Sequence, residues 1–244
     1  MKMISILLIE DHNMFREGLR LLLEAEGDMT VVGQGKTGRE AVAKYLELKP
    51  DVTVMDIAMP LLNGLQAAQQ ILKDNPLARI LMLSAHNDPE YVEEIITMGA
   101  SGYLVKQSSA ELLGKAIRDV HQGKTFYCPT ISKHLRDQYF TPFGKKGLVK
   151  NSKNRLTPRE AELLQLIAEG LVNKQIASEL SISIKTVEKH RQNLMEKLNI
   201  HDIAGLTRFA MASGVIESSG KQTPAHIAQR SNRRDSKSER QHKK

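Results

Sequence analysis

The chain contains a single cysteine, no tryptophan and no hydrophobic run approaching the roughly 20 residues that a membrane span needs. Cys128 has no second cysteine with which to form an internal disulfide, and this predicts a reducing compartment. The apolar run at residues 4–9 is too short for the core of a signal peptide. We therefore expect a soluble, cytoplasmic protein that has no membrane partner.

Basic side chains are fewer than acidic ones in the N-terminal half of the chain and outnumber them in the C-terminal half. Residues 1–121 hold 12 Lys and Arg against 17 Asp and Glu. The counts are 6 against 1 for residues 122–150, 9 against 7 for 151–216 and 8 against 3 for 217–244. This asymmetry predicts two functions, with the rear of the chain meeting a polyanion, although a solubilising surface charge would give the same balance.

Short apolar runs alternate with helix-like segments in the first half of the chain. The runs are residues 4–9, 29–32, 52–55, 80–83 and 102–105. The helix-like segments are residues 14–25, 38–48, 64–73, 89–98 and 109–122. This alternation predicts an α/β domain with a parallel sheet covered on both faces. Five units fit a flavodoxin-like doubly wound domain with the strand order 2-1-3-4-5.

The pattern changes after residue 122. Proline, glycine and lysine interrupt residues 123–153, which we predict to be a linker. Residues 154–216 are rich in helical periodicity, contain no strand-like run and predict a second, all-α domain. Residues 217–244 are polar and basic with almost nothing apolar, a composition typical of a disordered tail.

Charged and hydroxyl side chains follow four of the five strand-like runs. They are Glu10 and Asp11 after the first run, Asp56 after the third, Ser84 after the fourth and Lys106 after the fifth. The carboxyl ends of parallel strands meet at one edge of a sheet, where ligands bind. Three carboxylates at one edge repel each other, and Lys106 offsets only one charge. A Mg²⁺ ion would offset the rest, since it binds carboxylates, water and phosphate oxygens.

A carboxylate beside magnesium, an ammonium and a hydroxyl can attack a phosphoryl group. We therefore predict that Asp56 is a phosphorylation site. Taken singly, Asp56 is more often a turn residue, Ser84 a loop hydroxyl and Lys106 a solvated charge; their convergence favours the functional reading. His12 lies next to the acids, but no second histidine or cysteine joins it, so we interpret it as a helix-entry residue.

The first ~120 residues resemble the receiver domain of two-component response regulators. The segments "LLIEDH", "DVTVMDIAMPLLNGL", "LSAHND" and "GASGYLVK" match the landmarks of that family in order. The resemblance implies that Asp56 is the phosphoacceptor. It also implies that the side chains of Glu10, Asp11 and Asp56 and the carbonyl of Ala58 hold magnesium.

The same resemblance assigns three further residues. Ser84 is implied to be the switch hydroxyl, Tyr103 the switch aromatic and Lys106 the phosphate-binding lysine. The chain departs from many receivers after this lysine, because Gln107 stands where they have a proline.

The rear domain begins with a helix-start signature. Thr157, Pro158 and Glu160 form the pattern of a capping box, and Gly170 marks the end of this helix. Asn173 is predicted to cap a second helix over residues 174–180. A turn at residues 181–183 then leads to a longer helix that begins at residue 184 or 185 and ends at 198. Two helices joined by so short a turn predict a helix-turn-helix.

The longer helix is expected to have two faces. Val187, Leu194 and Leu198 form its core side. The residues predicted to reach base edges are Glu188, Lys189 and Gln192. Those predicted to contact phosphates are Lys174, Lys185 and Thr186.

The segment "NKQIASELSISIKTVEKHRQNLMEKL" resembles the DNA-binding domain of NarL/LuxR-type regulators. Together, the two resemblances imply a response regulator that takes phosphate from a histidine kinase and binds promoter DNA as a homodimer when phosphorylated. The implied protein is not an enzyme.

Three alternatives remain. A magnesium-dependent phosphatase would also use an aspartyl phosphate, but its usual second acid is replaced by Ala58. A constitutive DNA-binding regulator would have a receiver that is never phosphorylated. A receiver that acts through RNA fits the helix-turn-helix poorly.

Overall fold

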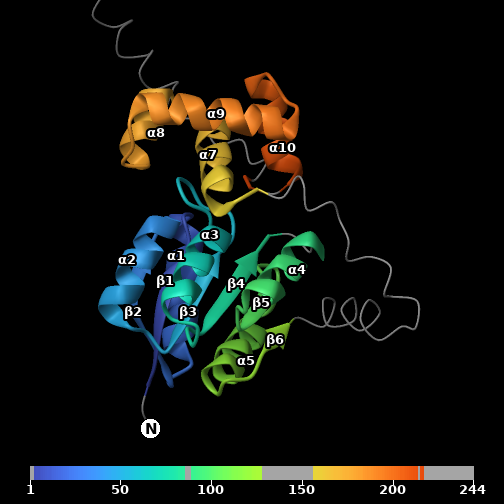
Figure 1. The fold of residues 1–244 in the computed structure, drawn as a ribbon. Coiled ribbons are helices and arrows are strands. Elements are labelled where there is room, and N and C mark those ends of the chain that lie inside the picture. Colours follow the sequence, from blue (N-terminus) through green and yellow to red (C-terminus); the bar gives the residue numbers. More distant parts are fainter. Residues whose placement is uncertain (1–2, 86–88, 128–155, 214, 217–244) are drawn as a thin grey trace, which may run out of the picture. The chain divides into compact units, whose positions relative to one another are not determined.

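The computed structural model describes residues 3–85, 89–127, 156–213 and 215–216. The chain forms two compact units, which are described separately (Figure 1). None of the helices in the described ranges has the length and hydrophobicity of a transmembrane helix. The predicted tail, residues 217–244, and the predicted linker from residue 128 onward lie outside the described residues.

The first unit is built on a six-stranded parallel sheet (Figure 1). Its strands are β1 (Ile4–Ile9), β2 (Met29–Gly35), β3 (Val52–Asp56), β4 (Ile80–Ser84), β5 (Gly102–Val105) and β6 (Phe126–Tyr127). Their order is β2-β1-β3-β4-β5-β6, so the predicted order of the first five strands and the flavodoxin-like fold are confirmed. All residues of β3, β4 and β5 are buried, as expected for strands that are covered on both faces.

Within the described residues, five helices pack around this sheet, and each begins and ends within one residue of its prediction. They are α1 (Asn13–Ala25), α2 (Gly38–Leu48), α3 (Gly64–Asp74), α4 (Pro89–Met98) and α5 (Ala110–His121). Side-chain caps begin several of them. Thr37 accepts a hydrogen bond from the Glu40 N–H at 3.2 Å, and Asn63 accepts one from the Gln66 N–H at 2.9 Å.

Strand β6 lies in the segment that was predicted to be a linker, so the boundary at residue 122 is wrong. The Phe126 N–H donates to the Ser101 carbonyl at 3.0 Å, and the Phe126 side chain is buried in the core. Gly102 permits this pairing, because a Cβ there would lie 2.6 Å from the Phe126 carbonyl oxygen. A two-residue strand has no alternation that a sequence pattern could reveal.

The second unit is helical, as predicted. The helices of this part of the chain are α7 (Pro158–Ala168), α8 (Asn173–Glu179), α9 (Ile184–Leu198) and α10 (Ile203–Ala212), and the boundary between the two units falls within α7, after Glu162. The capping box is present: the Thr157 N–H donates to the Glu160 carboxylate at 2.7 Å, and the Glu160 N–H donates to Thr157 Oγ1 at 3.3 Å. Gly170 follows α7 with φ of 86°, a conformation that favours glycine.

The predicted cap of α8 is wrong by one residue. Val172 is the N-cap, and its N–H donates to the side-chain oxygen of Gln175 at 3.0 Å. Asn173 is the first helical residue instead, and its side-chain oxygen accepts a hydrogen bond from Arg191 on α9. The Asn173 side chain therefore binds Arg191, which is distant in sequence, instead of capping the helix that follows it.

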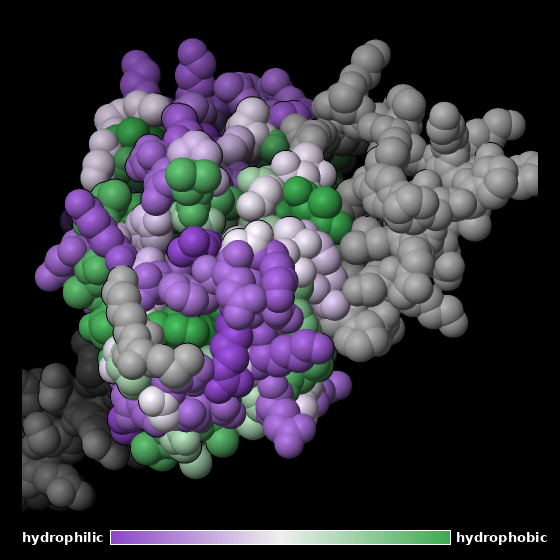
Figure 2. Space-filling model, turned by 90° about the horizontal axis from the view of Figure 1, so that it is seen from below, coloured by the Kyte–Doolittle hydropathy of each residue, from purple (hydrophilic) through white to green (hydrophobic). Residues whose placement is uncertain are grey.

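The molecular surface is mixed in character. Figure 2 shows one face on which hydrophilic residues cover broad areas and hydrophobic residues form separate patches. Exposed large hydrophobic side chains are spread over several elements of both units, among them Met14, Leu46, Leu77 and Ile184. Scattered apolar residues of this kind are normal for a soluble surface.

Candidate functional site

The strand ends bring the predicted phosphorylation residues to one edge of the sheet. Asp56 and Ser84 are the last residues of β3 and β4, and Lys106 follows β5 directly. The Lys106 N–H donates to the Ser84 carbonyl at 2.7 Å, which continues the ladder between β4 and β5. Glu10 follows β1, and its N–H donates to the Gly35 carbonyl of β2 at 3.0 Å. The parallel sheet therefore gathers side chains that lie far apart in sequence.

The loop between β3 and α3 fits closely around Asp56 because residue 64 is a glycine. The Gly64 N–H donates to the Ile57 carbonyl at 2.8 Å. A Cβ at this position would lie 1.9 Å from the Asp56 carbonyl oxygen, far inside van der Waals contact. Ala58 lies in this loop, and the role of its carbonyl as a magnesium ligand stays a prediction.

Lys106 joins the acids of two strands. Its Nζ lies 2.8 Å from Glu10 Oε2 and 2.9 Å from Asp56 Oδ2. Glu10 is fully buried and Asp56 is 1% exposed, so these ion pairs are shielded from water. Nζ also lies 5.2 Å from the centre of the Phe15 ring on α1, within the range of a cation–π contact.

The pKa of Lys106 reflects two opposing effects. Burial disfavours the charged ammonium and lowers the pKa, but the negative charge of Asp56 and the hydrogen bond and charge of Glu10 raise it. The net result is a pKa above that of an ordinary lysine. Lys106 is therefore protonated at neutral pH, as its predicted role of binding phosphate requires.

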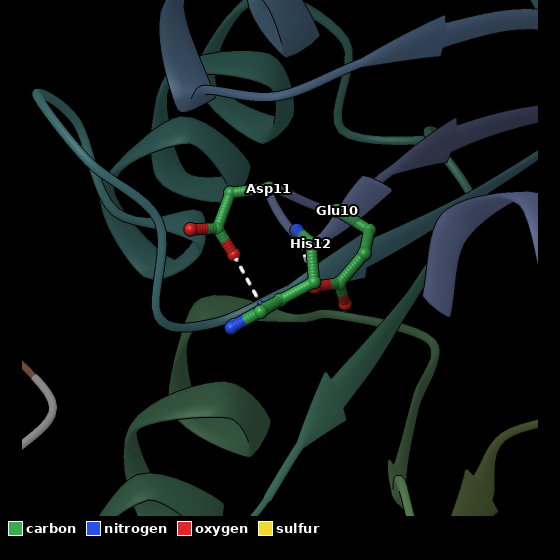
Figure 3. Close-up of side chains that lie close together, drawn as sticks. All are labelled: Glu10, Asp11 and His12. Carbon is green, nitrogen blue, oxygen red and sulfur yellow. Dashed lines mark hydrogen bonds and ion pairs between the residues drawn. The ribbon is translucent and has the colours of Figure 1, made fainter. Parts of the chain in front are cut away.

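Glu10, Asp11 and His12 form a compact cluster at the start of α1 (Figure 3). His12 Nδ1 lies 2.9 Å from both Glu10 Oε1 and Asp11 Oδ1, and the His12 N–H donates to Glu10 Oε1 at 3.0 Å. His12 is the N-cap residue of α1, so its interpretation as a helix-entry residue is confirmed. Its contact with both acids was not predicted, although its place directly after them was the available signal.

The donor set of this edge fits magnesium. Lys106 pairs with the carboxylates of Glu10 and Asp56, and Asp11 lies beside Glu10 in the adjacent cluster, which leaves an excess of negative charge in a largely buried position. Burying this excess is unfavourable unless a cation offsets it. Oxygen ligands with room for water are those that Mg²⁺ prefers. An acidic cluster suited to the metal is therefore present.

The two predicted switch residues occupy different positions. Ser84 is 4% exposed at the end of β4, beside the acids. Tyr103 lies inside β5, paired in register with Met82, and its side chain is fully buried. The fold places Ser84 at the predicted phosphate edge and holds the Tyr103 ring within the core.

In the second unit, α9 presents the predicted base-reading residues to solvent. Val187 and Leu194 are fully buried, whereas Glu188, Lys189 and Gln192 are exposed. Lys174 on α8 and Lys185 at the start of α9 are also exposed. A hollow of about 390 Å³ beside α9 is lined by Glu188 and Gln192 among others.

Hydrogen bonds fix the start of α9 and its contact with α8. Ser183 caps α9 by accepting from the Thr186 N–H at 3.1 Å, and the two hydroxyls lie 2.8 Å apart. Arg191 Nη1 donates to Asn173 Oδ1 at 2.8 Å and so joins the two helices of the motif. Sequence reasoning missed Arg191, because it lies between the core stripe and the exposed face.

Comparison with known proteins assigns both units. The model of the response regulator receiver domain matches residues 6–118, and the model of bacterial regulatory proteins of the luxR family matches residues 154–210. The transcriptional regulatory protein DegU of Brevibacillus brevis is 36% identical over 210 residues, which cover 82% of this chain and 89% of DegU. The oxygen regulatory protein NreC of Staphylococcus carnosus is 35% identical over 215 residues, covering 87% and 99% respectively.

Solved structures agree with this assignment. A LuxR-family two-component response regulator from Aurantimonas sp. SI85-9A1 has a TM-score of 0.55 at 31% identity and covers 57% of this chain and 100% of its own. The RcsB–DNA complex has a TM-score of 0.53 at 25% identity and covers 87% of this chain and 99% of its own. The chain belongs to the NarL/LuxR-type response regulators, which combine a receiver domain with a LuxR-type helix-turn-helix DNA-binding domain.

Proposed function

We propose that this chain is a phosphorylation-dependent transcriptional regulator of a two-component system, which accepts phosphate on Asp56 from a histidine kinase and binds promoter DNA. The observation that carries the proposal is the buried bridge from Lys106 to Asp56 and Glu10, at 2.9 and 2.8 Å. It gathers a nucleophilic carboxylate, a phosphate-binding cation and a metal-binding acid at one strand edge. Catalysis of phosphoryl transfer needs this combination of positioning and charge.

In the proposed reaction, an Asp56 carboxylate oxygen attacks the phosphorus atom of the donor. A bond forms between that oxygen and phosphorus while the bond from phosphorus to the donor breaks, and the donor leaves with its electron pair. Magnesium, held by Glu10, Asp11, Asp56 and the Ala58 carbonyl, would neutralise charge on the phosphoryl oxygens. The Lys106 ammonium binds a phosphoryl oxygen, and the Ser84 hydroxyl donates to another.

The proposed output follows from the new charge. The phosphoryl group draws Ser84 and Lys106 toward it, and Tyr103 moves with them. This change favours a homodimer that presents two copies of α9 to promoter DNA. Lys189, Glu188 and Gln192 would read base edges, while Lys174, Lys185 and Thr186 would contact phosphates.

Acetyl phosphate and MgCl₂ test the proposed phosphorylation site. The wild-type protein should gain the mass of one phosphoryl group, the adduct should be labile in acid and base, and Asp56→Asn should gain nothing. Asp74→Asn, which changes an exposed carboxylate at the end of α3, is the matched control and should react like the wild type. Equal phosphorylation of the Asp56→Asn protein would refute the assignment, and a wild-type protein that takes no phosphate would favour the constitutive regulator.

A further inference from the structure

Arg16 carries a buried positive charge that the proposed phosphate chemistry leaves without a role. Its side chain lies on the first turns of α1, and the residue is 7% exposed. Nη1 donates to the Glu10 carbonyl at 2.6 Å, Nε donates to Gln34 Oε1 at 3.0 Å and Nη2 donates to Asn13 Oδ1 at 2.8 Å. All three acceptors are neutral. Burying a guanidinium without a carboxylate partner is unfavourable. A buried arginine of this kind is therefore a candidate for a functional role.

The bond to the Glu10 carbonyl completes a set of contacts around that residue. The Glu10 N–H donates to the Gly35 carbonyl at 3.0 Å, Oε1 accepts from the His12 N–H at 3.0 Å and Oε2 pairs with Lys106 at 2.8 Å. Strand β1 ends at Ile9, so the Glu10 carbonyl lies beyond the strand and is held by Arg16. The arginine therefore fixes the peptide between Glu10 and Asp11.

We propose that Arg16 is a positioning residue for the magnesium site, an inference that rests on the proposed function. Arg16 holds the carbonyl of the peptide between Glu10 and Asp11. It thereby fixes the direction in which the side chains of these two acids project from the β1–α1 turn. The guanidinium fork suits this role, because it fixes three bonds in one plane, whereas an ammonium acts as a point charge. The side-chain oxygen of Gln34 on β2 orients the fork, and the backbone carbonyl of Gln34 accepts a hydrogen bond from Lys44 on α2.

The first test measures magnesium binding without any phosphorylation. MgCl₂ is titrated into the unphosphorylated full-length protein, and the dissociation constant is read from shifts in its NMR spectrum. Arg16→Lys keeps the charge and loses the fork. It should weaken magnesium binding about tenfold or more, as loss of a residue that orients metal ligands usually does. Arg20→Lys is the matched control, because Arg20 lies four residues on, is more exposed and pairs only with Glu17 and Glu24 in the described structure.

The second test separates positioning from general damage to the fold. The rate of phosphorylation by acetyl phosphate should fall for Arg16→Lys at low magnesium and return to near the wild-type rate at saturating magnesium. A damaged fold would lower the rate at every concentration. Gln34→Ala, which removes the side chain that orients the fork and leaves Arg16 in place, should weaken magnesium binding in the same direction.

The outcomes distinguish the inference from the function on which it rests. If the wild type binds no magnesium and takes no phosphate, the proposed function fails. If the wild type does both and Arg16→Lys binds magnesium with the wild-type constant, the positioning role is refuted and the proposed function stands. Should Arg16→Lys fail to fold, Gln34→Ala decides: weaker binding supports the role, and unchanged binding overturns it.

Discussion

At the scale of single residues, the phosphorylation site is a balance of buried charge in which Lys106 is central. Removing its ammonium leaves Glu10 and Asp56 as neighbouring buried carboxylates without their common partner. Two neighbouring carboxylates repel each other, so keeping both ionised becomes less favourable. A bound magnesium ion would then have more negative charge to offset. The lysine pairs with Glu10 and Asp56 in this structure, and under the proposed function it would bind the phosphoryl oxygens after phosphorylation.

We predict that Lys106→Ala keeps the fold and separates phosphorylation from its output. The variant should still gain a phosphoryl group from acetyl phosphate, because Asp56 and the metal ligands remain, but its DNA affinity should no longer respond. Mass spectrometry and a DNA-binding titration on the same sample measure both. Lys124→Ala, which removes a solvent-exposed lysine, is the control. A phosphorylated Lys106→Ala protein that activates like the wild type would show that the lysine serves only the buried ion pairs and plays no part in the output.

A second charged group at this scale makes stability depend on pH. Arg118 on α5 pairs with Glu26 at 2.7 Å and with Asp28 at 2.7 Å, and its hydrogen bond lowers the pKa of Asp28. A carboxyl whose pKa is lowered by folding adds stability above its unfolded pKa and loses this contribution as the pH falls through the folded pKa.

Arg118→Gln should therefore lower the free energy of unfolding at pH 7 by about 0.5–1 kcal/mol, a small value because all three side chains are partly exposed. The difference from the wild type should shrink as the pH falls through the pKa of the folded Asp28 carboxyl, because below it that carboxyl is protonated in both the folded and the unfolded protein. Urea unfolding at pH 7 and at pH 3 measures it. A deficit of the same size at both pH values would contradict this account of the pair.

At the scale of elements, the turn after β3 decides where Asp56 points. Gly64→Ala would place a Cβ 1.9 Å from the Asp56 carbonyl oxygen, so the backbone must move. We predict a loss of roughly 1–3 kcal/mol in the free energy of unfolding, typical of overpacking, together with slower phosphorylation. Gly18→Ala in α1 is the control, because no atom lies within 4 Å of the added Cβ; it should stabilise by about 0.5–1 kcal/mol. Equal behaviour of the two variants would show that the turn does not constrain Asp56.

The two helices of the DNA-binding motif should use chemically identical lysines differently. Lys189 lies on the exposed face of α9, away from Val187 and Leu194, whereas Lys174 lies at the start of α8. Lys189→Ala should cost about 1–3 kcal/mol on the preferred site and relax discrimination at one or two base pairs. Lys174→Ala should weaken all sequences about equally and reduce the salt slope by about one unit.

A panel of single-base variants of the preferred site, measured at several salt concentrations, separates these roles. If both substitutions weaken every site in the same proportion, the assignment of Lys189 to base reading is wrong.

Periodicity and end signals explain why most elements could be predicted from the sequence. Apolar runs located the first five strands, and the predicted ends of α2, Gly38 and Leu48, are those of the structure. Strand β6 could not be predicted, because two residues give no pattern and its pairing depends on Gly102, distant in sequence. The cap of α8 failed for a related reason, since Arg191 on another helix binds the Asn173 side chain.

The candidate site likewise has features that the sequence predicts and features that depend on tertiary contacts. That Asp56 and Lys106 approach one edge follows from parallel topology, which the alternation of elements predicts. The bridge from Lys106 to Glu10 and the contact of His12 with both acids depend on side-chain rotamers and on how the β1–α1 turn leaves the sheet. These are tertiary properties that no local pattern contains.

At the scale of the whole molecule, the chain joins a receiver domain to a LuxR-type DNA-binding domain, and the proposed function requires that one affects the other. Charge is unevenly distributed along the chain: residues 1–121 are acidic and residues 122–244 are basic. Linkage requires that any preference of the phosphorylated state for DNA be matched by a preference of the DNA-bound state for phosphate. Under the proposed function, phosphorylation at Asp56 and DNA affinity are thus two readouts of one equilibrium.

The most direct test measures DNA affinity as a function of phosphorylation. Duplexes are selected from a random pool with the acetyl phosphate-treated protein, and binding to the selected site is titrated for wild-type and Asp56→Asn proteins with and without acetyl phosphate. The wild type should gain about tenfold in affinity on phosphorylation, equivalent to ~1.4 kcal/mol of coupling, and Asp56→Asn should not respond. A wild-type protein that binds the site equally well in both states, and no better than Asp56→Asn, would contradict phosphorylation-dependent regulation and support the constitutive alternative.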